Sequence, residues 1–250
     1  MTPSAREAAA IQLLDQWLAG QPVEAALTQW GRASRFAGSG DREAVRDLVF
    51  QAVRRRLSAA SLGGSETGRG LLLGLARQAG SRPDWSGEGH SPAALSPEEE
   101  ELFDTPLPDL PEGAALDCPD WLLTRFRAAL GADTAPVLSL MRDRAPVFLR
   151  VNRTRATSAQ VSAELAKDGI ETRPQSLAET ALEVTQNPRR LRNSAALSEG
   201  RIEMQDAASQ AIALDFAREA GKGPVLDYCA GGGGKSLALA AEGLTVSAHD

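Results

Sequence analysis

The stretch Val225-Leu-Asp-Tyr-Cys-Ala-Gly-Gly-Gly-Gly-Lys-Ser236 joins a short apolar run to a segment with helical spacing. Residues 224–228, bounded by glycines, are predicted to form a buried strand, residues 235–241 a helix and residues 244–249 a second strand. Strand, glycine-rich turn, helix and strand in this order open a doubly wound α/β sheet. Glycines there let a ligand approach the backbone, and the start of the helix offers unpaired N–H groups. This stretch therefore predicts a ligand-binding loop.

Carboxylates stand at the ends of both predicted strands. Asp227 ends the first strand, where the binding crevices of open α/β sheets lie. Asp250 ends the second, about twenty residues after the loop, and this spacing suits a carboxylate that accepts hydrogen bonds from ribose hydroxyls. In an S-adenosylmethionine loop, an acidic strand end is followed by small residues at alternate positions. Asp227, Cys229, Gly231 and Gly233 satisfy that pattern.

Other interpretations of the loop fit less well. A phosphate-binding loop, G-x-x-x-x-G-K-[ST], would end on Gly234-Lys235-Ser236 but would need a glycine where Cys229 stands. A dinucleotide loop, G-x-G-x-x-G, would need a glycine at Ser236 or at Leu237. A purely structural turn is the remaining alternative. S-adenosylmethionine is therefore the predicted ligand.

Upstream of this loop, the patterning predicts three further regions. Residues 1–80 are predicted to be an all-helical domain, with helices at 4–18, 23–30, 41–56 and 68–78. Residues 81–115, rich in proline, glycine and carboxylates, are predicted to be an acidic linker with one short helix at 97–103. Residues 116–200 are predicted to be a small α+β unit, with helices at 121–130, 134–141 and 158–167 and strands at 145–152 and 182–184.

The last region, residues 201–250, is predicted to begin with a helix at 206–220 and to continue into the strand, loop, helix and strand described above. Only two strands precede Asp250, and a parallel sheet needs more strands and two covered faces. We therefore expect the sequence to stop inside this domain.

Charge is unevenly distributed along the chain. The formal net charge is −6, which taken alone argues against a nucleic-acid partner. Between residues 83 and 120, however, there are eleven Asp and Glu and no Lys or Arg, whereas residues 141–192 carry ten basic and six acidic side chains. The acidic surplus is thus confined to one segment, and RNA remains a possible partner for the rest.

Composition excludes several other classes. Two cysteines and two histidines cannot build a disulfide framework or a metal knuckle. Arg6, Glu7 and Asp15 interrupt the first helix, which a signal-peptide core would not tolerate, and no apolar run reaches the ~20 residues of a membrane helix. We expect a cytoplasmic monomer without metal or membrane contact.

The glycine loop resembles the L-D-x-C-A-A-P-G-G-K-T signature of the RsmB/Sun (Nop2-type) RNA cytosine-5 methyltransferases. Gly231 and Gly232 replace the family's Ala-Pro, Ser236 replaces Thr, and five residues match directly: Cys229, Ala230, Gly233, Gly234 and Lys235. Residues 200–210, GRIEMQDAASQ, are similar to the family's G-x-x-x-x-Q-D-x-x-S-Q element, and residues 146–152, PVFLRVN, to its L-R-V-N element. Residues 34–56 resemble the helical NusB-type domain that precedes the methyltransferase in bacterial members.

The resemblance implies three parts: an all-α NusB-like domain, a small α+β RNA-facing subdomain and the start of a Rossmann-like class I methyltransferase domain. It implies S-adenosylmethionine as cofactor, held by Asp250 and by the loop residues Cys229, Ala230, Gly231, Gly232, Gly233, Gly234 and Lys235. It also implies a cysteine thiolate that adds to carbon 6 of cytosine, so that carbon 5 can attack the methyl group. In the family both catalytic cysteines follow the second strand, so no catalytic residue is expected within residues 1–250.

RNA, with ribosomal RNA foremost, is the partner that the resemblance implies. Arg150, Asn152, Arg153, Arg189 and Arg190 are candidate RNA contacts on the α+β unit. Cys229 is expected to belong to the cofactor turn, Cys118 to be packed in a core, and His249 to be structural. The rival hypothesis is a non-catalytic RNA-binding module of antitermination type with a degenerate methyltransferase appendage.

Overall fold

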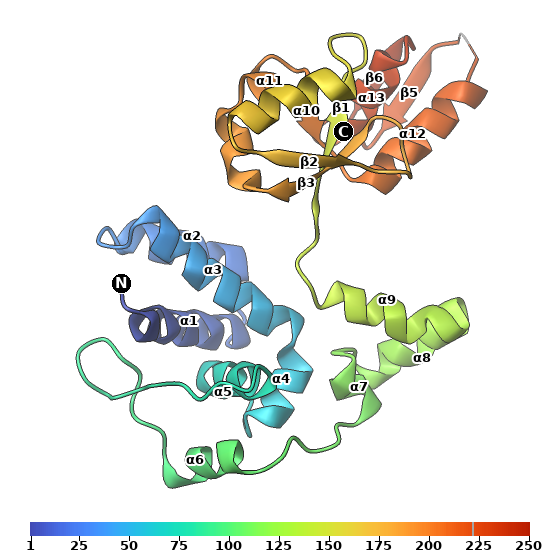
Figure 1. The fold of residues 1–250 in the computed structure, drawn as a ribbon. Helices are drawn as coiled ribbons and strands as arrows, with labels where there is room; N and C mark the ends of the chain where they lie inside the picture. Colours follow the sequence, from blue (N-terminus) through green and yellow to red (C-terminus); the bar gives the residue numbers. More distant parts are fainter. Residues whose placement is uncertain (222) are drawn as a thin grey trace. The chain divides into compact units, whose positions relative to one another are not determined.

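The computed structural model describes residues 1–221 and 223–250 and divides into two compact units, Met1–Arg144 and Ala145–Asp250 (Figure 1). The division differs from the boundaries expected near residues 80, 116 and 200. The acidic segment and the two helices that follow it group with the N-terminal helices, because side chains of the N-terminal helices hold them. None of the described helices is both long and apolar enough to cross a membrane.

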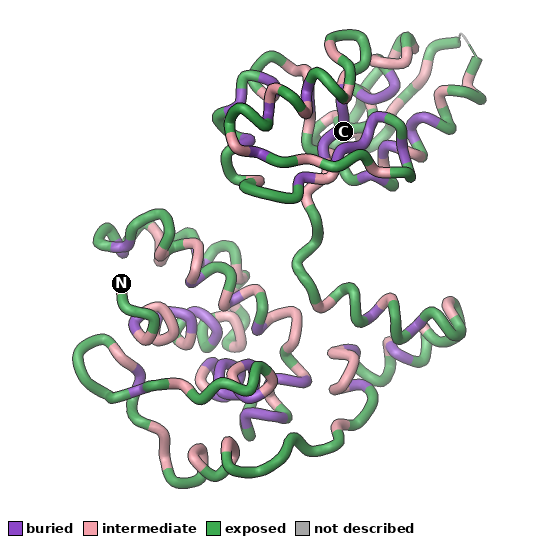
Figure 2. Tube along the Cα trace, viewed as in Figure 1, coloured by how far each residue is buried: buried purple, intermediate pink, exposed green. Residues whose placement is uncertain are grey.

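The first unit is built on five helices whose apolar stripes face one another. They are α1 (Pro3–Leu18), α2 (Val23–Ala33), α3 (Ser39–Arg54), α4 (Arg56–Leu62) and α5 (Gly68–Gln78). The core includes Leu13, Leu14, Val45, Val49 and Leu71, each at most 1% exposed, and it lies where α1 and α5 are coloured purple in Figure 2. The helices expected at 4–18, 23–30 and 68–78 are therefore confirmed.

The start of α3 corrects one expectation. The helix begins at Ser39, with Gly38 as its N-cap, and not at Asp41. Asp41 is the third residue of the helix, and its carboxylate accepts a hydrogen bond from the N–H of Gly38 at 3.2 Å. A carboxylate at the third helical position that accepts the backbone N–H of the N-cap residue forms one half of a capping box. The same carboxylate accepts from Arg6 and from the N-terminal ammonium group.

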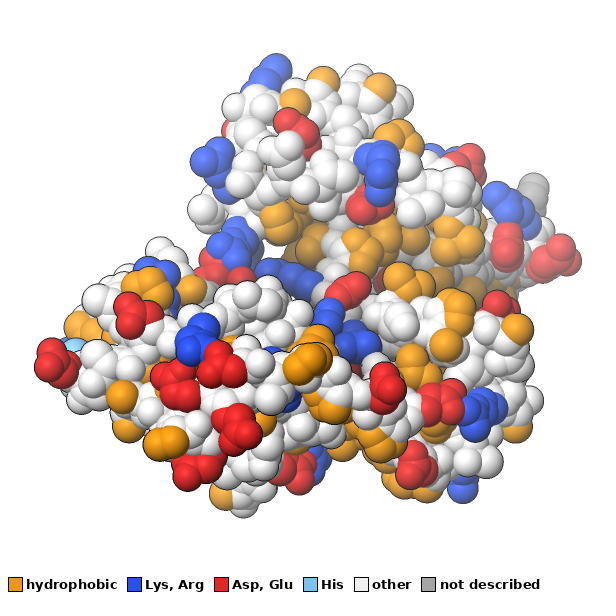
Figure 3. Space-filling model, turned by 60° about the horizontal axis from the view of Figure 1, so that its bottom comes forward, with side chains coloured by type: hydrophobic (Ala, Val, Ile, Leu, Met, Phe, Trp, Pro, Cys, Tyr) orange, Lys and Arg blue, Asp and Glu red, His pale blue; other side chains and the backbone are white. Residues whose placement is uncertain are grey.

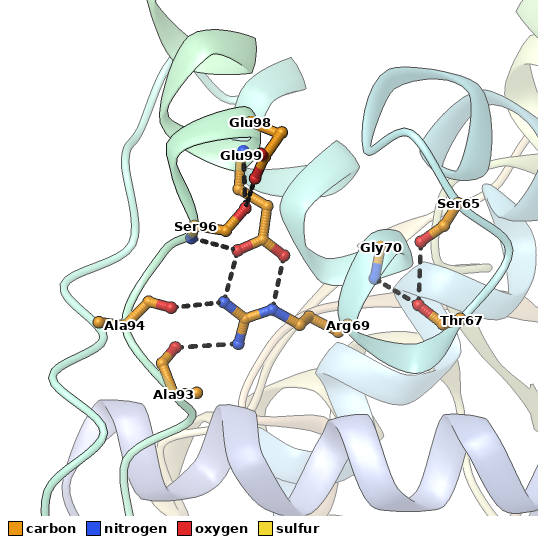
Figure 4. Close-up of polar contacts among 9 residues, drawn as sticks. All are labelled: Ser65, Thr67, Arg69, Gly70, Ala93, Ala94, Ser96, Glu98 and Glu99. Carbon is orange, nitrogen blue, oxygen red and sulfur yellow. Dashed lines mark hydrogen bonds and ion pairs between the residues drawn. The ribbon is translucent and has the colours of Figure 1, made fainter.

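The acidic segment 81–115 follows the surface of this unit and is attached to it by arginines. Figure 4 shows the guanidinium of Arg69, from α5, facing both Glu99 oxygens and the carbonyls of Ala93 and Ala94, with distances of 2.6–3.1 Å. The same guanidinium lies 4.6 Å from the ring centre of Trp85, which is 5% exposed. Hydrogen bonding by Arg69 lowers the pKa of Glu99 against the opposing effect of burial.

Within the acidic segment, the short helix expected at 97–103 is present as α6 (Pro97–Asp104), and α7 (Glu112–Ala115) follows it. Arg77, from α5, attaches this stretch to the helices, whereas Arg82 lies in the segment itself and pairs within it. Arg77 donates to the carbonyls of Leu62 and Pro106, and Arg82 pairs with Glu100 and Asp104. Acidic side chains gather on the face of this unit that is turned forward in Figure 3. The segment is a strap on the helical unit; we call residues 84–106 the acidic strap.

Asp117 connects helix α4 with the segment at the C-terminal end of the first unit. Its carboxylate, 3% exposed, accepts from the N–H and the hydroxyl of Ser58 at 2.8 and 2.9 Å and pairs with Arg142 at 2.9 Å. Ser58 belongs to α4, and Arg142 follows α9 (Thr134–Met141), which is preceded by α8 (Asp120–Leu130) and a 3-10 turn at Gly131–Asp133. A buried carboxylate needs such partners, so these three segments are held together at one point.

The second unit contains two sheets. The first is antiparallel, in the order β2-β3-β1-β4, and consists of β1 (Val147–Val151), β2 (Glu171–Pro174), β3 (Ala181–Gln186) and β4 (Ile202–Met204). It packs against α10 (Ser158–Lys167) and α11 (Ala195–Ser198) over a core that includes Leu149, Leu165 and Leu182. The patterning predicted β1, α10 and β3, but β2 and β4 are too short to show a period.

The second sheet pairs β5 (Val225–Tyr228) with β6 (Val246–His249) in parallel, joined by α13 (Gly234–Ala241) and flanked by α12 (Ala207–Glu219). Figure 1 shows α12 and α13 beside this pair. The strand, loop, helix and strand order is confirmed, but the burial expected for 224–228 is wrong. Val225 packs against the helices, whereas Leu226 and Tyr228 point to the other face and are 62% and 69% exposed. Successive side chains alternate between faces, and only one face is covered.

Candidate functional site

The glycine loop between β5 and α13 is a tight turn built on left-handed backbone. Cys229, Gly231 and Gly233 have φ values of +67°, +53° and +79°. The N–H of Ala230 donates to the carbonyl of His249 at 2.9 Å, and the N–H of Gly233 donates to the carbonyl of Ala230 at 2.9 Å. Left-handed φ favours glycine, and at Cys229 a side chain tolerates it at some cost in strain. The alternate small residues predicted from sequence are therefore alternate left-handed positions.

Asp250 closes this loop from the second strand. Its Oδ1 accepts a hydrogen bond from the N–H of Gly231 at 3.0 Å, so the two predicted site elements lie together. Its other carboxylate oxygen has no donor within residues 1–221 and 223–250. One oxygen thus holds the loop and the other is available to a ligand hydroxyl.

Asp227 has a different role. Its Oδ2 accepts from the hydroxyl of Ser236 at 2.5 Å, which ties the end of β5 to the first turn of α13. This contact uses the hydroxyl that a phosphate-binding loop would offer to a metal ion. Among the described residues, no group of three or more His, Cys, Asp or Glu side chains is placed to hold a metal.

The loop leaves room for a ligand. A Cβ atom built on Gly231, Gly232 or Gly233 would meet nothing within 4 Å, and Lys235 is exposed at the start of α13. Exposed amides at a helix start attract negatively charged groups, such as the carboxylate of an amino acid. S-adenosylmethionine carries such a carboxylate, as well as two ribose hydroxyls. The open loop and the free Asp250 oxygen therefore fit the cofactor's chemistry.

The G-x-x-x-x-Q-D-x-x-S-Q element lies against this loop. Asp206 caps α12 by accepting the N–H of Ala208 at 2.8 Å. Gln205 donates to the carbonyl of Gly234 at 3.1 Å, and Gln210 is 1% exposed. The sequence singled out this element only by resemblance and did not predict Gln205 as a site residue. Gln205 follows β4, a strand of three residues that the sequence pattern does not reveal, so its contact with the loop could not be predicted.

The two cysteines lie in contrasting surroundings. Cys229 is exposed in the loop, whereas Cys118 is 3% exposed and packs with Leu123 and Leu138. Burial, and then the charge of Asp120, raise the pKa of the Cys118 thiol. The expectation that Cys118 is a packed core residue is confirmed.

His249 also has a structural contact. Its ring stacks on Tyr228 with centroids 5.0 Å apart, on the exposed face of the parallel pair. This stacking is consistent with the structural role expected for His249, and it joins the ends of β5 and β6.

Three candidate RNA contacts lie at the end of β1, where each has protein partners. Arg150 is 3% exposed and pairs with Glu203 directly across from it on β4. Asn152 accepts from the N–H and the hydroxyl of Thr154, which forms the turn after the strand. Arg153 bridges Glu179 and Glu242 at 2.7 and 2.8 Å. Burial acts to lower the pKa of Arg153, but Glu242 and Glu179 together outweigh it, so the pKa is raised.

Arg189 and Arg190 lie exposed in the 3-10 helix Pro188–Asn193. Arg190 donates from its guanidinium to the carbonyl of Asp168 at 2.8 Å, so the guanidinium is held beside the end of α10. Arg192 lies exposed in the same short helix. Of the five candidates, Arg189 and Arg190 are the two whose residues are exposed in a helix outside the sheet.

Comparison with known proteins finds similarity to methyltransferases. Residues 118–189 match the family model described as the RsmF/B-like methyltransferase ferredoxin-like domain. The crystal structure of PH0851 shares the fold, with a TM-score of 0.64 and 18% identity over 100% of this chain and 64% of that chain.

Curated relatives make the assignment more specific. The ribosomal RNA small subunit methyltransferase B of Vibrio cholerae is 34% identical over 118 residues, which are 47% of this chain and 27% of that protein. The protein of the same name from Xanthomonas campestris is 32% identical over 127 residues, 48% of this chain and 27% of the relative. The chain thus matches less than a third of the length of these relatives. The resemblance to the RsmB/Sun family of methyltransferases is confirmed.

Proposed function

We propose that this protein is a class I, S-adenosylmethionine-dependent methyltransferase that acts on carbon 5 of cytosine in ribosomal RNA. The observation that carries the proposal is the closed glycine loop, in which Asp250 from the second strand accepts the N–H of Gly231 and keeps one oxygen free. Relatives named ribosomal RNA small subunit methyltransferase B support the substrate class.

In this proposal the residues of the chain bind and orient the cofactor. The free oxygen of Asp250 accepts from a ribose hydroxyl, and residues 229–235 surround the amino-acid end. When bound, the cofactor supplies an electrophilic methyl group. Ser236 and Asp227 keep α13 in place behind the loop. Neither cysteine of the chain is proposed as the nucleophile, because Cys118 is buried and Cys229 forms part of the turn.

RNA binding is proposed for the antiparallel sheet and its flanking turns, with the exposed Arg189 and Arg190 among the candidates for phosphate contacts. The helical residues 1–80 are proposed to be a NusB-like domain, and the protein is proposed to be a cytoplasmic monomer. Arg150 and Asn152 would support the surface from within the sheet, since both are engaged by protein partners.

Calorimetric titration with S-adenosylmethionine tests the cofactor assignment. We expect binding, and Asp250→Ala should weaken it by about 1–3 kcal/mol, or roughly 5- to 150-fold, because charge-assisted hydrogen bonds are lost. Asp215→Ala is the matched control, since Asp215 is an exposed aspartate on α12 that pairs with Arg218 on the same helix. Equal affinity of Asp250→Ala and the unchanged chain would remove Asp250 from the site.

The same titration separates the rival function. A non-catalytic RNA-binding module would shift ribosomal RNA in a gel but would show no heat with S-adenosylmethionine. A phosphate-binding loop would instead bind a nucleoside triphosphate. Either result would contradict the proposal.

A further inference from the structure

A continuous series of hydrogen bonds joins the antiparallel sheet to the glycine loop. The carbonyl of Thr180 accepts from the N–H of Val151 in β1 at 2.8 Å. The hydroxyl of Thr180 donates to Oε1 of Gln210 at 2.8 Å, and Nε2 of Gln210 donates to the carbonyl of Gln205 at 2.8 Å. Nε2 of Gln205 then donates to the carbonyl of Gly234 at 3.1 Å.

The inner half of this series is fixed by burial. Thr180 and Gln210 are 2% and 1% exposed, and a buried polar group without a partner destabilises the fold. Gln210 uses both ends of its amide, so its orientation is determined. The main chain of Gln205 is held a second time, because its N–H donates to the carbonyl of Phe148 at 3.2 Å. The backbone of Gln205 is therefore held at both its N–H and its carbonyl group.

The side chain of Gln205 is oriented by Gly234. Its Oε1 is buried and has no hydrogen-bond donor in the described part of the chain. Rotating the amide by 180° would place that oxygen against the carbonyl oxygen of Gly234, and two acceptors repel. The amide thus leaves one acceptor unpaired in order to hold the carbonyl at the first residue of α13.

We infer that Gln205 is a positioning residue, which sets the glycine loop and the start of α13 relative to the sheet that carries the candidate RNA contacts. The inference rests on the proposed function for its effect on cofactor binding. Binding sites need their backbone held to within a fraction of an ångström, and loops obtain this from neighbouring hydrogen bonds. Gln205 provides that hold from the position directly after β4, a strand of the other sheet.

Two substitutions test the inference. Gln205→Ala removes the donor, and Gln205→Glu keeps the size but replaces the donor with an acceptor. We expect both variants to lose affinity for S-adenosylmethionine by about 2- to 12-fold, the value of one neutral hydrogen bond. Amide hydrogen exchange of residues 229–236 should become faster, while the melting temperature changes little. Gln186→Ala, an exposed glutamine at the end of β3, is the matched control.

The outcomes separate this inference from the proposed function. If the unchanged chain does not bind S-adenosylmethionine, the proposed function fails, and local exchange at residues 229–236 still decides the role of Gln205. If both variants bind and exchange like the Gln186→Ala control, the inference is overturned. It is also overturned if exchange accelerates equally throughout residues 145–250, because Gln205 would then only stabilise the fold.

Discussion

At the scale of single residues, the contrast between Cys229 and Cys118 separates a loop thiol from a core thiol. Cys229 was expected to belong to the cofactor turn, and the structure places it in the glycine loop with φ at +67°. A thiol reacts as its thiolate and only where a reagent can reach it. Exposure makes Cys229 accessible, whereas burial and a raised pKa protect Cys118.

This contrast predicts two rates of thiol labelling. With a chromogenic disulfide reagent at pH 8, one thiol per folded chain should react quickly and the second slowly, since Cys118 must first be exposed by local opening. Cys229→Ser should remove the fast phase and leave S-adenosylmethionine binding within about threefold, because serine is also small and polar. A fast phase that persists in Cys229→Ser would contradict the burial of Cys118.

At the scale of elements, the acidic strap shows what patterning can miss. A segment rich in proline, glycine and carboxylates looks like a linker, and we predicted one. What attaches it is not periodic: Arg69 and Arg77 of α5 contact separate points of the strap, and Arg82, just before the strap, pairs with Asp104 within it. Trp85, within the same segment, is buried in the helical core. Contacts of this kind depend on tertiary geometry and leave no local signal.

The pKa of Glu99 gives the strap a pH dependence. Hydrogen bonding by Arg69 lowers the folded-state pKa of Glu99 below its ordinary value, which is about 4.3 in an unfolded chain. The pair therefore stabilises the folded state fully above that ordinary value, and the contribution is lost as the pH falls through the lowered pKa.

Thermal unfolding followed at pH 7 and at successively lower pH measures this contribution. Glu99→Gln should lower the melting temperature at pH 7 and should show less further loss on acidification than the unchanged chain. Glu101→Gln is the control, because Glu101 lies on the same helix without an ion pair among the described residues. Parallel acid profiles for Glu99→Gln and the unchanged chain would exclude a role for this pair.

The loop was better predicted than the strap because its signal is local. Left-handed positions at Gly231 and Gly233 favour glycine, so the turn can be recognised from neighbouring residues of the sequence. The contact from Gln205 to Gly234 spans 29 residues and two sheets, and spacing alone does not show it. The same holds for Arg150, whose pairing with Glu203 depends on the register of β1 and β4.

At the scale of the whole molecule, the two units predict how fragments behave. Residues 1–144 should fold independently, because their apolar core and the hydrogen bonds of the buried Asp117 carboxylate lie within the unit. Residues 1–80 should also fold as a helical domain but melt at a lower temperature, since they lack Trp85 and the strap partners of Arg69 and Arg77.

Circular dichroism melts of the two fragments measure the difference. Trp85→Ala in residues 1–144 should reproduce part of this loss of stability. We expect it to lower the free energy of unfolding by about 3–5 kcal/mol, as is typical for a buried aromatic side chain. Equal melting temperatures for residues 1–80 and 1–144 would mean that the strap adds nothing to stability. Failure of residues 1–80 to fold would contradict the predicted boundary near residue 80.

The open face of the β5–β6 pair affects how the protein behaves as a solute. Leu226 and Tyr228 present apolar surface there, with Met204, Ile212 and Leu237 also exposed in the same unit. Apolar surface that meets water raises the chemical potential of the dissolved chain, and contact between copies lowers it. Sulfate strengthens that tendency because it is excluded from protein surfaces. We therefore expect salting-out at low ammonium sulfate, and an osmotic second virial coefficient that becomes more negative as ammonium sulfate is added.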